Sequence, residues 1–378
     1  MYADSFKRTH NIENVLVSFN KLKENKNKIF IAGRIMAKRI MGKVVFFDIQ
    51  DGSGRMQCFC SKSELLEDVF INLKKDSKIG DIVGVGGSVF VTQKNEKTVK
   101  VEDFQILSVS IRDLPEKFHG LNDTETRYRK RYLDLIMNSE TRDVFKKRCK
   151  IIAAIRDFLT KDGFVEVETP IFQNNPCGAS ANPFKTHYDA KNLDMYLRIS
   201  PETLLKQLIV GGMEKIFEIG KSFRNEGVDT SHLQEFTMLE YYVAYWNYKD
   251  NMVFIQQLLR EVILNTIGTL KFEHRGAALD FEKDWNIVDY QELVLRDSGI
   301  DILAYDNPSD LETEIRKAGI DLGEIKNISL GNLIDKLYKK CSRPKLIQPT
   351  ILLHHPASLI PLARLNDEDN RVIDSFQV

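Results

Sequence analysis

The sequence predicts an α+β protein, in which a small β-barrel comes first and a mixed region of helices and antiparallel strands follows. Three observations lead to this prediction. Five strand-like runs follow one another between residues 28 and 110, an amphipathic helical pattern covers residues 139–162, and two strands with clear alternation lie between residues 215 and 245. A chain of 378 residues has room for two or three such domains.

The composition excludes several classes of protein without selecting a function. Hydrophobic residues make up 43% and charged residues 29% of the chain, which is ordinary for a globular protein. No apolar run is long enough to cross a bilayer, the N-terminus lacks the apolar core of a signal peptide, and the five cysteines show no paired metal-ligand spacing. We therefore expect a cytoplasmic protein with reduced thiols and no membrane partner.

The charges are balanced overall but unevenly distributed. The formal net charge is zero, yet lysine and arginine concentrate at residues 21–43 and again at residues 127–131. Such clusters can contact phosphates. A solvated lysine-rich surface is the commoner explanation, and the charges alone favour it.

The first region fits a closed barrel of the OB type, with an SH3-like barrel as the structural alternative. A turn, DGSG, is expected at residues 51–54, and a helical insertion at residues 61–75. Alternation along the third run places Gln57 and Phe59 on one outer face, where rings stack on unpaired bases and amides bind base edges. For Phe46, Phe47 and Phe59 taken individually, core packing is the commoner role. The five runs are IFIAGRIMAK, KVVFFDIQD, RMQCFCS, IVGVGGSVFVT and KTVKVEDFQILS.

Residues 111–142 are predicted to be a linker, because LPE at residues 114–116 interrupts regular structure and the segment is rich in charge. The helix at 139–162 is expected to end at Gly163 and to lead into a short strand that ends at Pro170. Ser200 is the expected N-cap of the next helix. Residues 249–341 show a mainly helical pattern, and strands are expected again at 351–353 and 373–378.

The two strands between residues 215 and 245 carry an unusual set of polar side chains. Glu240 and Tyr242 lie on a pleat that is otherwise apolar, and burial of a carboxylate is costly unless it is paired. Either an internal lysine or arginine or a cationic ligand therefore satisfies Glu240, and spacing alone favours the internal partner. The same alternatives hold for Glu202, for which stabilisation by the helix dipole is the simpler explanation.

Several segments, in this order, resemble the class II aminoacyl-tRNA synthetases and in particular their lysine branch. GFVEVETP (163–170) resembles the dimer-forming motif 1, and FRNEG (223–227) with HLQEFTMLEYY (232–242) resembles the ATP-binding motif 2. The lysine branch is matched by AGRIMAKRIMGK and DGSGRMQ in the barrel, and by RYRKRYLDLI, CGASANPF and DMYLRISPE after it. The resemblance extends over nearly the whole chain, from about residue 28 to residue 378.

The resemblance implies a function and a fold. It implies activation of L-lysine with ATP and Mg²⁺ to lysyl-adenylate, transfer to tRNA(Lys), a homodimer, and a class II antiparallel sheet flanked by helices. Its domains would be an OB-fold anticodon-binding domain (1–110), a linker (111–142) and a catalytic domain (143–378) with a mainly helical insertion at about 285–342.

It also implies roles for individual residues. Arg224, the catalytic residue, would hold the α-phosphate, with Glu226, His232 and Phe236 on the rest of ATP; Gly178, Ala179, Glu202, Glu240 and Tyr242 would bind lysine; and Phe46, Gln57, Glu96 and Lys38 would bind the anticodon. Ser231 and Leu233 depart from the family pattern beside the ATP phosphates.

The third class II motif and the acidic segment that supplies the Mg²⁺ ligands have no counterpart in the sequence. No metal ligand is therefore expected in this chain, and the Mg²⁺ ligands of the family would lie beyond Val378. We accordingly expect a chain truncated at its C-terminus, poorly stable and nearly inactive in adenylation. Three alternatives stay open: a related aspartate or asparagine ligase, against which the two glutamates argue; a paralogue that lysylates a translation factor; and a non-catalytic module for RNA binding or dimerisation.

Overall fold

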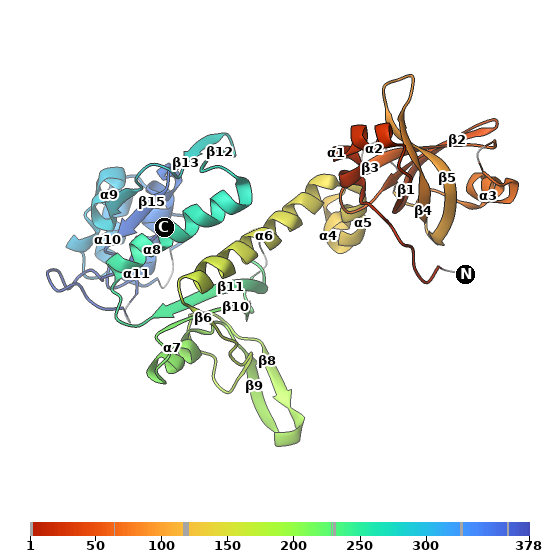
Figure 1. Cartoon of the computed structure of the whole chain (residues 1–378). Helices are drawn as coiled ribbons and strands as arrows, with labels where there is room; N and C mark the ends of the chain where they lie inside the picture. Colours follow the sequence, from red (N-terminus) through yellow and green to blue (C-terminus); the bar gives the residue numbers. More distant parts are fainter. Residues whose placement is uncertain are drawn as a thin grey trace. The chain divides into compact units, whose positions relative to one another are not determined.

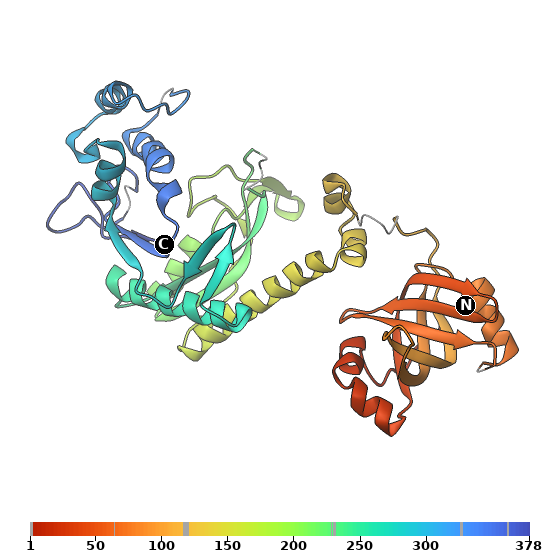
Figure 2. The same cartoon turned by 90° about the horizontal axis from the view of Figure 1, so that it is seen from above.

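The computed structural model describes residues 3–63, 65–115, 121–227, 229, 232–325, 328–360 and 363–378. The chain divides into two compact units, residues 1–143 and residues 144–378, and each unit has its own core (Figures 1 and 2). In the described part of the chain, no helix is both long enough and apolar enough to cross a membrane.

The first unit is built on a closed barrel with the strand order β1-β2-β3-β5-β4. Strict alternation of buried and half-buried residues along β2 and β3 gives the barrel an apolar interior, as the sequence pattern predicts. The parallel pairing of β3 with β5, together with a helix between β3 and β4, is the OB topology and excludes the SH3-like alternative. The strands are β1 (Ile29–Met41), β2 (Val44–Gln50), β3 (Arg55–Ser61), β4 (Ile82–Val91) and β5 (Lys97–Ser108).

Helical segments complete the barrel core. The sequence prediction missed two short helices before the barrel, although their side chains Ile12, Val15 and Phe19 are almost completely buried against it. The expected insertion at 61–75 is helical only in its second half, where Phe70 and Leu73 enter the core. These elements are α1 (Ile12–Val17), α2 (Phe19–Asn25), α3 (Glu67–Ile71) and the π-helical turn η1 (Asn72–Asp76).

The segment predicted as a linker contains two helices, α4 (Thr124–Arg129) and α5 (Arg131–Met137). Their organising residue is Asp134, which is completely buried and accepts hydrogen bonds from Arg127, Arg131, Asn138 and Thr141. Burial of a carboxylate is stable only with such partners. Two arginines of the basic cluster at 127–131 are therefore structural.

The second unit is organised around the antiparallel pair β10 and β11. Their Phe217, Leu239 and Tyr241 pack with Leu159 of α6 and Phe254 of α8, so one face of the pair is core. Figure 1 shows α6 and α8 on one side of β10 and β11 and α7 on the other. Alternation places Glu218, Ser222 and Glu240 on the face toward α7. The elements are α6 (Ser139–Lys161), β6 (Val165–Glu166), α7 (Glu202–Val210), β10 (Lys215–Phe223), β11 (Glu235–Val243) and α8 (Tyr248–Ile267).

The remaining elements follow the predicted pattern with three corrections. Strands interrupt the segment 249–341, which was expected to be mainly helical; the predicted strand 373–378 is reduced to β16, which ends before Val378; and Pro201, not Ser200, occupies the cap position of α7. Three helices between residues 290 and 341 share a separate apolar cluster. The elements are β7 (Phe172–Gln173), β8 (Lys185–Tyr188), β9 (Leu193–Leu197), β12 (Lys271–His274), β13 (Ala277–Asp280), β14 (Asn286–Asp289), α9 (Tyr290–Ser298), α10 (Pro308–Lys317), α11 (Leu330–Cys341), β15 (Thr350–Leu353), β16 (Phe376–Gln377) and the short 3₁₀ turns at 189–191, 302–304 and 343–345.

Candidate active site and RNA-binding surface

The register in which β10 pairs with β11 determines which side chains lie together in the site. Glu218 lies opposite Glu240, and Ser222 lies opposite Phe236, so both strands contribute to one polar face. Arg224 follows directly after β10, and its backbone N–H donates to the carbonyl of Gln234 at 2.9 Å. The site therefore has an arginine and an aromatic ring at one end of the pair and two carboxylates further along it.

The arginine end contains a pocket of about 280 Å³. The Arg224 guanidinium carbon lies 5.2 Å from the centre of the Phe236 ring, a cation–π distance. The Nε of Arg224 is buried and has no hydrogen-bond partner within the described residues, so this charged group retains a donor for a ligand. The lining residues are Arg224, Glu226, Gly227, His232, Leu233, Gln234 and Phe236.

Two predicted ATP residues lie at the outer rim of this pocket. Glu226 is exposed, and the His232 ring lies 2.6 Å from a carboxylate oxygen of Asp229. That contact orients the imidazole without burying it. Ser231, which the sequence singles out beside the phosphates, lies outside the described residues.

Glu240 lies at the acidic end and has two hydrogen-bond donors. Ser200 donates to one carboxylate oxygen at 2.5 Å, and the Tyr242 hydroxyl donates to the other at 3.3 Å. Burial and the negative charge of Glu202 raise the pKa of Glu240, while the bond from Ser200 opposes the rise. No basic side chain forms an ion pair with Glu240 among the described residues. The internal cation that spacing favours is thus not at Glu240.

Glu202 is more exposed and has a different partner. Lys206, one turn later on α7, approaches its carboxylate to 2.7 Å, and the two side chains are 59% and 37% exposed. An exposed pair at this spacing contributes little to stability, and a better-placed cation can replace the lysine. The internal partner that the sequence allowed for Glu202 is therefore present but weak.

Gly178 lies against both Glu202 and Ser200, and its conformation requires glycine. Its φ is +88°, and a Cβ at this position would lie 3.0 Å from the Cβ of Glu202 and 3.1 Å from Oγ of Ser200. Backbone groups can therefore approach the acidic end closely. Ala179, the next residue, is exposed.

A buried ion pair beneath the site was missed in the sequence. Arg198 and Glu218 are each almost completely buried, and an Nη of Arg198 lies 2.5 Å from Oε1 of Glu218. Thr169 joins them: its hydroxyl donates to Glu218 and accepts from Arg198. A Cβ at position 220 would lie 2.2 Å from the guanidinium, so only Gly220 allows this approach. The one sequence signal was Glu218, an acidic residue on the same pleat as Glu240.

The barrel presents three of the four predicted anticodon residues in one pocket of about 630 Å³. Phe46 and Phe59 lie side by side with ring centres 5.1 Å apart, and Gln57 accepts a hydrogen bond from Thr98 at 3.0 Å. The amide nitrogen of Gln57 is then the group left to bind a ligand. The pocket is lined by Arg39, Met41, Phe46, Gln57, Phe59, Phe90, Thr92, Gln93, Lys94 and Glu96.

Lys38 is not brought into this pocket. Its ammonium donates to the backbone carbonyls of Lys74 and Ser77 and to the hydroxyl of Ser77, at 2.6–3.2 Å. Burial lowers the pKa of this lysine. Its role in the structure is to tie β1 to η1, while the neighbouring Arg39 lines the pocket.

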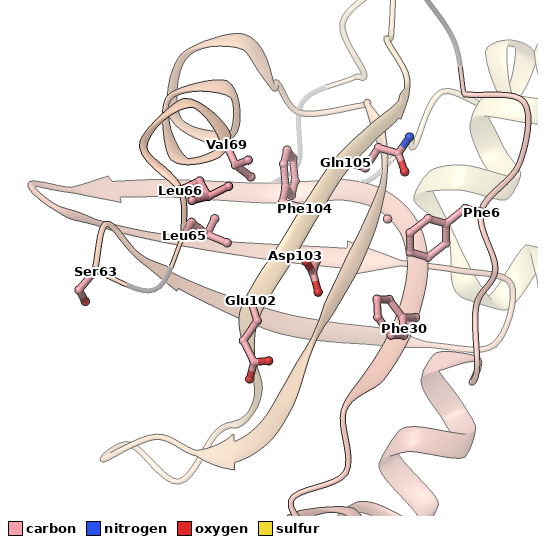
Figure 3. A pocket seen from close by; sticks show the side chains of 11 residues that line it. Phe6, Phe30, Ser63, Leu65, Leu66, Val69, Glu102, Asp103, Phe104 and Gln105 are labelled. Carbon is pink, nitrogen blue, oxygen red and sulfur yellow. The ribbon is translucent and has the colours of Figure 1, made fainter.

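A second barrel pocket, of about 790 Å³, has a different lining (Figure 3). Phe6 and Phe30 lie close together at one end of it, and Leu65, Leu66 and Val69 lie at the other. The acidic residues Glu102 and Asp103 are both paired with Lys28. This pocket also contains a ring pair and the amide of Gln105, but the two ring centres are farther apart, at 6.4 Å, and two paired carboxylates line it.

Comparison with known proteins identifies both parts of the chain. Residues 29–107 match the model of the OB-fold nucleic acid binding domain, which confirms the predicted barrel. Residues 123–377 match the model of the class II tRNA synthetases for D, K and N. The chain belongs to the class II tRNA synthetase family.

Curated relatives of this class II tRNA synthetase share one name. The lysine–tRNA ligase of Pelotomaculum thermopropionicum is 44% identical over 377 residues, which are 100% of this chain and 74% of the relative. Those of Actinobacillus succinogenes and Haemophilus influenzae are 44% and 43% identical, over 94% of this chain and 71% of each relative. The α+β class II architecture predicted from the sequence is thereby confirmed.

The described residues of this synthetase contain no group of three or more His, Cys, Asp or Glu side chains placed to hold a metal ion. Mg²⁺ in nucleotide sites commonly takes much of its coordination from phosphate oxygens and water.

Val378, beyond which the resemblance places the Mg²⁺ ligands of the family, is the residue directly after β16. Its side chain is 53% exposed, and it is not among the residues that line the Arg224 pocket. The position of the metal ligands beyond Val378 stays a prediction from the resemblance.

Proposed function

We propose that this class II tRNA synthetase activates L-lysine with ATP and transfers it to tRNA(Lys). The observation that carries the proposal is Glu240, a half-buried carboxylate without an ionic partner in the described chain, which lies near a second carboxylate and on the same strand as Phe236 of the arginine pocket. Lysine offers two ammonium groups, so Glu240 would bind its side chain and Glu202 its α-ammonium. Neutral amino acids would leave Glu240 unpaired.

The nucleotide would occupy the pocket beside Arg224. The planar guanidinium can donate two parallel hydrogen bonds to α-phosphate oxygens. Phe236 would stack on adenine, Glu226 would accept from its amino group, and His232 would lie near the distal phosphates. Mg²⁺ would supply further neutralisation of phosphate charge.

Catalysis would then depend mainly on positioning. A carboxylate oxygen of lysine attacks the α-phosphorus in line, the bond to the β-phosphate oxygen breaks, and pyrophosphate leaves. Arg224 offsets the charge that develops on the phosphoryl oxygens. A ribose hydroxyl of tRNA next attacks the adenylate carbonyl and releases AMP, with Gly178 and Ala179 holding the amino acid by backbone groups.

Titration calorimetry with a panel of amino acids tests which amino acid is the substrate. We expect the purified chain to bind L-lysine and to bind L-aspartate and L-asparagine at least a hundredfold more weakly, since only lysine brings positive charge to both glutamates. Tighter binding of aspartate or asparagine would identify a sibling ligase. Binding of tRNA(Lys) without any amino acid would identify a non-catalytic RNA-binding module.

The anticodon would bind the barrel pocket that contains Phe46, Gln57 and Glu96. Replacement of Phe46 by alanine is expected to weaken tRNA(Lys) binding about tenfold, because a base stacked on an aromatic ring contributes roughly 1–3 kcal/mol. Filter binding measures the effect, and Phe30→Ala is the matched control because it removes a half-buried ring from the second pocket (Figure 3). Equal losses in both variants would contradict an anticodon site at Phe46.

Two further features stay predictions. A homodimer is supported by the exposed apolar side chains Val144, Ile151 and Val165 on α6 and β6, which are 64%, 40% and 51% exposed. A monomeric mass in sedimentation would contradict it. A cytoplasmic location stays an expectation from the sequence.

A further inference from the structure

The hydroxyl of Ser200 occupies a position between the two carboxylates of the site. Ser200 is only 2% exposed and lies two residues before Glu202, at the start of α7. Its Oγ accepts a hydrogen bond from the backbone N–H of Glu202 at 3.1 Å and donates to Oε1 of Glu240 at 2.5 Å. One hydroxyl thus connects the helix that carries Glu202 to the strand that carries Glu240.

The first of these hydrogen bonds has a fixed direction. A backbone N–H can only donate, so the Ser200 oxygen is the acceptor toward Glu202. The hydroxyl proton is then free to point at Glu240, whose other carboxylate oxygen accepts from the Tyr242 hydroxyl. Both oxygens are acceptors only in the ionised carboxylate, so the arrangement favours the charged form of Glu240.

The other groups around Glu240 act in the opposite direction. Glu202 on α7 and Glu218 on β10 bring negative charge, and burial disfavours ionisation. Two cations lie near but have other partners: Arg198 pairs with Glu218, and Lys206 pairs with Glu202. Tyr242 is itself a weak donor here, at 3.3 Å.

We propose that Ser200 is a specificity-determining positioning residue, which orients the Glu240 carboxylate and keeps it ionised for the side-chain ammonium of the amino acid. The geometry of the neighbours supports this role, because a Cβ at position 178 would lie 3.1 Å from the Ser200 oxygen, so Gly178 keeps open the space that the hydroxyl occupies. The proposal rests on the proposed function, since it assigns the ligand of Glu240.

The test is a pH series of L-lysine titrations with the full chain and with Ser200→Ala. Loss of a hydrogen bond to a charged group is expected to weaken lysine binding about tenfold at pH 7. Without the donor the pKa of Glu240 rises further, so a larger fraction is protonated at acid pH and unable to bind a cation. As the pH is lowered, the lysine affinity of Ser200→Ala should therefore begin to fall at a higher pH than that of the unaltered chain. The difference in lysine affinity between the two proteins should narrow above pH 8.

Two further variants separate this role from a structural one. Ser200→Thr retains the hydroxyl and is expected to keep the unaltered pH profile, which also serves if Ser200→Ala fails to fold. Ser342→Ala removes another buried serine hydroxyl of the second unit, one that hydrogen-bonds neither Glu202 nor Glu240, and is expected to change nothing.

The outcomes are distinct. A pH-dependent loss of lysine affinity in Ser200→Ala, together with the unaltered affinity and pH profile in Ser200→Thr, supports the proposal. Lysine binding with the same affinity and pH profile in Ser200→Ala overturns it and leaves the proposed function intact. If the unaltered chain binds no lysine, the proposed function and this inference are both overturned.

Discussion

Replacement of Glu240 by glutamine is expected to lower the affinity for L-lysine by a factor of about 30 to 5000. The glutamine keeps the shape and the hydrogen bond from Ser200 but removes the charge opposite the ligand ammonium. When one partner of a buried charge pair is removed, the binding free energy weakens by about 2–5 kcal/mol, because the other charge is left desolvated and unpaired. Titration calorimetry measures the change in Kd directly.

Glu235→Gln is the matched control for this experiment. Glu235 lies on the same strand, is 57% exposed at its side chain and pairs with Lys221 at 2.9 Å. The same chemical change at this exposed pair should alter lysine affinity by less than about a factor of 2. An unchanged Kd in Glu240→Gln would remove Glu240 from the lysine site and leave the proposed substrate without its main support.

Replacement of Arg198 by methionine is expected to lower the unfolding free energy of the second unit by about 3–5 kcal/mol. Methionine fills much of the volume, but it leaves the Glu218 carboxylate buried beside Thr169 without its cation. Breaking a buried ion pair on one side is costly for this reason, whereas exposed pairs contribute about 0–1 kcal/mol. Arg316→Ala, which breaks an exposed pair with Glu312, is the control.

Urea denaturation followed by tryptophan fluorescence isolates the relevant unit. Both tryptophans of the chain, Trp246 and Trp285, belong to the second unit, so the signal does not report the barrel. A shift in the Arg198→Met midpoint no larger than that of Arg316→Ala would show that the buried pair contributes nothing to stability. If the double variant Arg198→Met with Glu218→Gln regains part of the lost unfolding free energy, the uncompensated carboxylate is confirmed as the cause.

Local patterns predicted most of the second unit around the site. Alternation placed the strands at 215–224 and 235–245 within two residues of β10 and β11, and the amphipathic pattern at 139–162 matched α6 within one residue. Such patterns succeed because burial of one face is decided by neighbours along the chain. The helices α1 and α2 were missed because each is too short for a clear period, although the side chains of Ile12, Val15 and Phe19 are buried against the barrel.

Partners that are distant in sequence were identified only in the structure. Spacing favoured an internal cation at Glu240 over a cationic ligand, and the structure places the buried cation at Glu218, directly across the pair. The family resemblance implies that Lys38 binds the anticodon, and in the structure its ammonium binds carbonyls 36 and 39 residues away. A charge pattern shows that a partner is needed and does not show which one the fold supplies.

The sequence by itself determined the barrel, the hairpin and the order of motifs, because periodicity and motif order are properties of the chain. Only the tertiary structure decided that Glu218 is neutralised by a buried cation and that Glu240 has no ionic partner among the described residues. The reason is geometric: Ser200 and Glu240 are 40 residues apart, and Arg198 and Glu218 are 20 apart. Their contacts exist only after α7 and the segment that connects it to β9 have packed against β10 and β11.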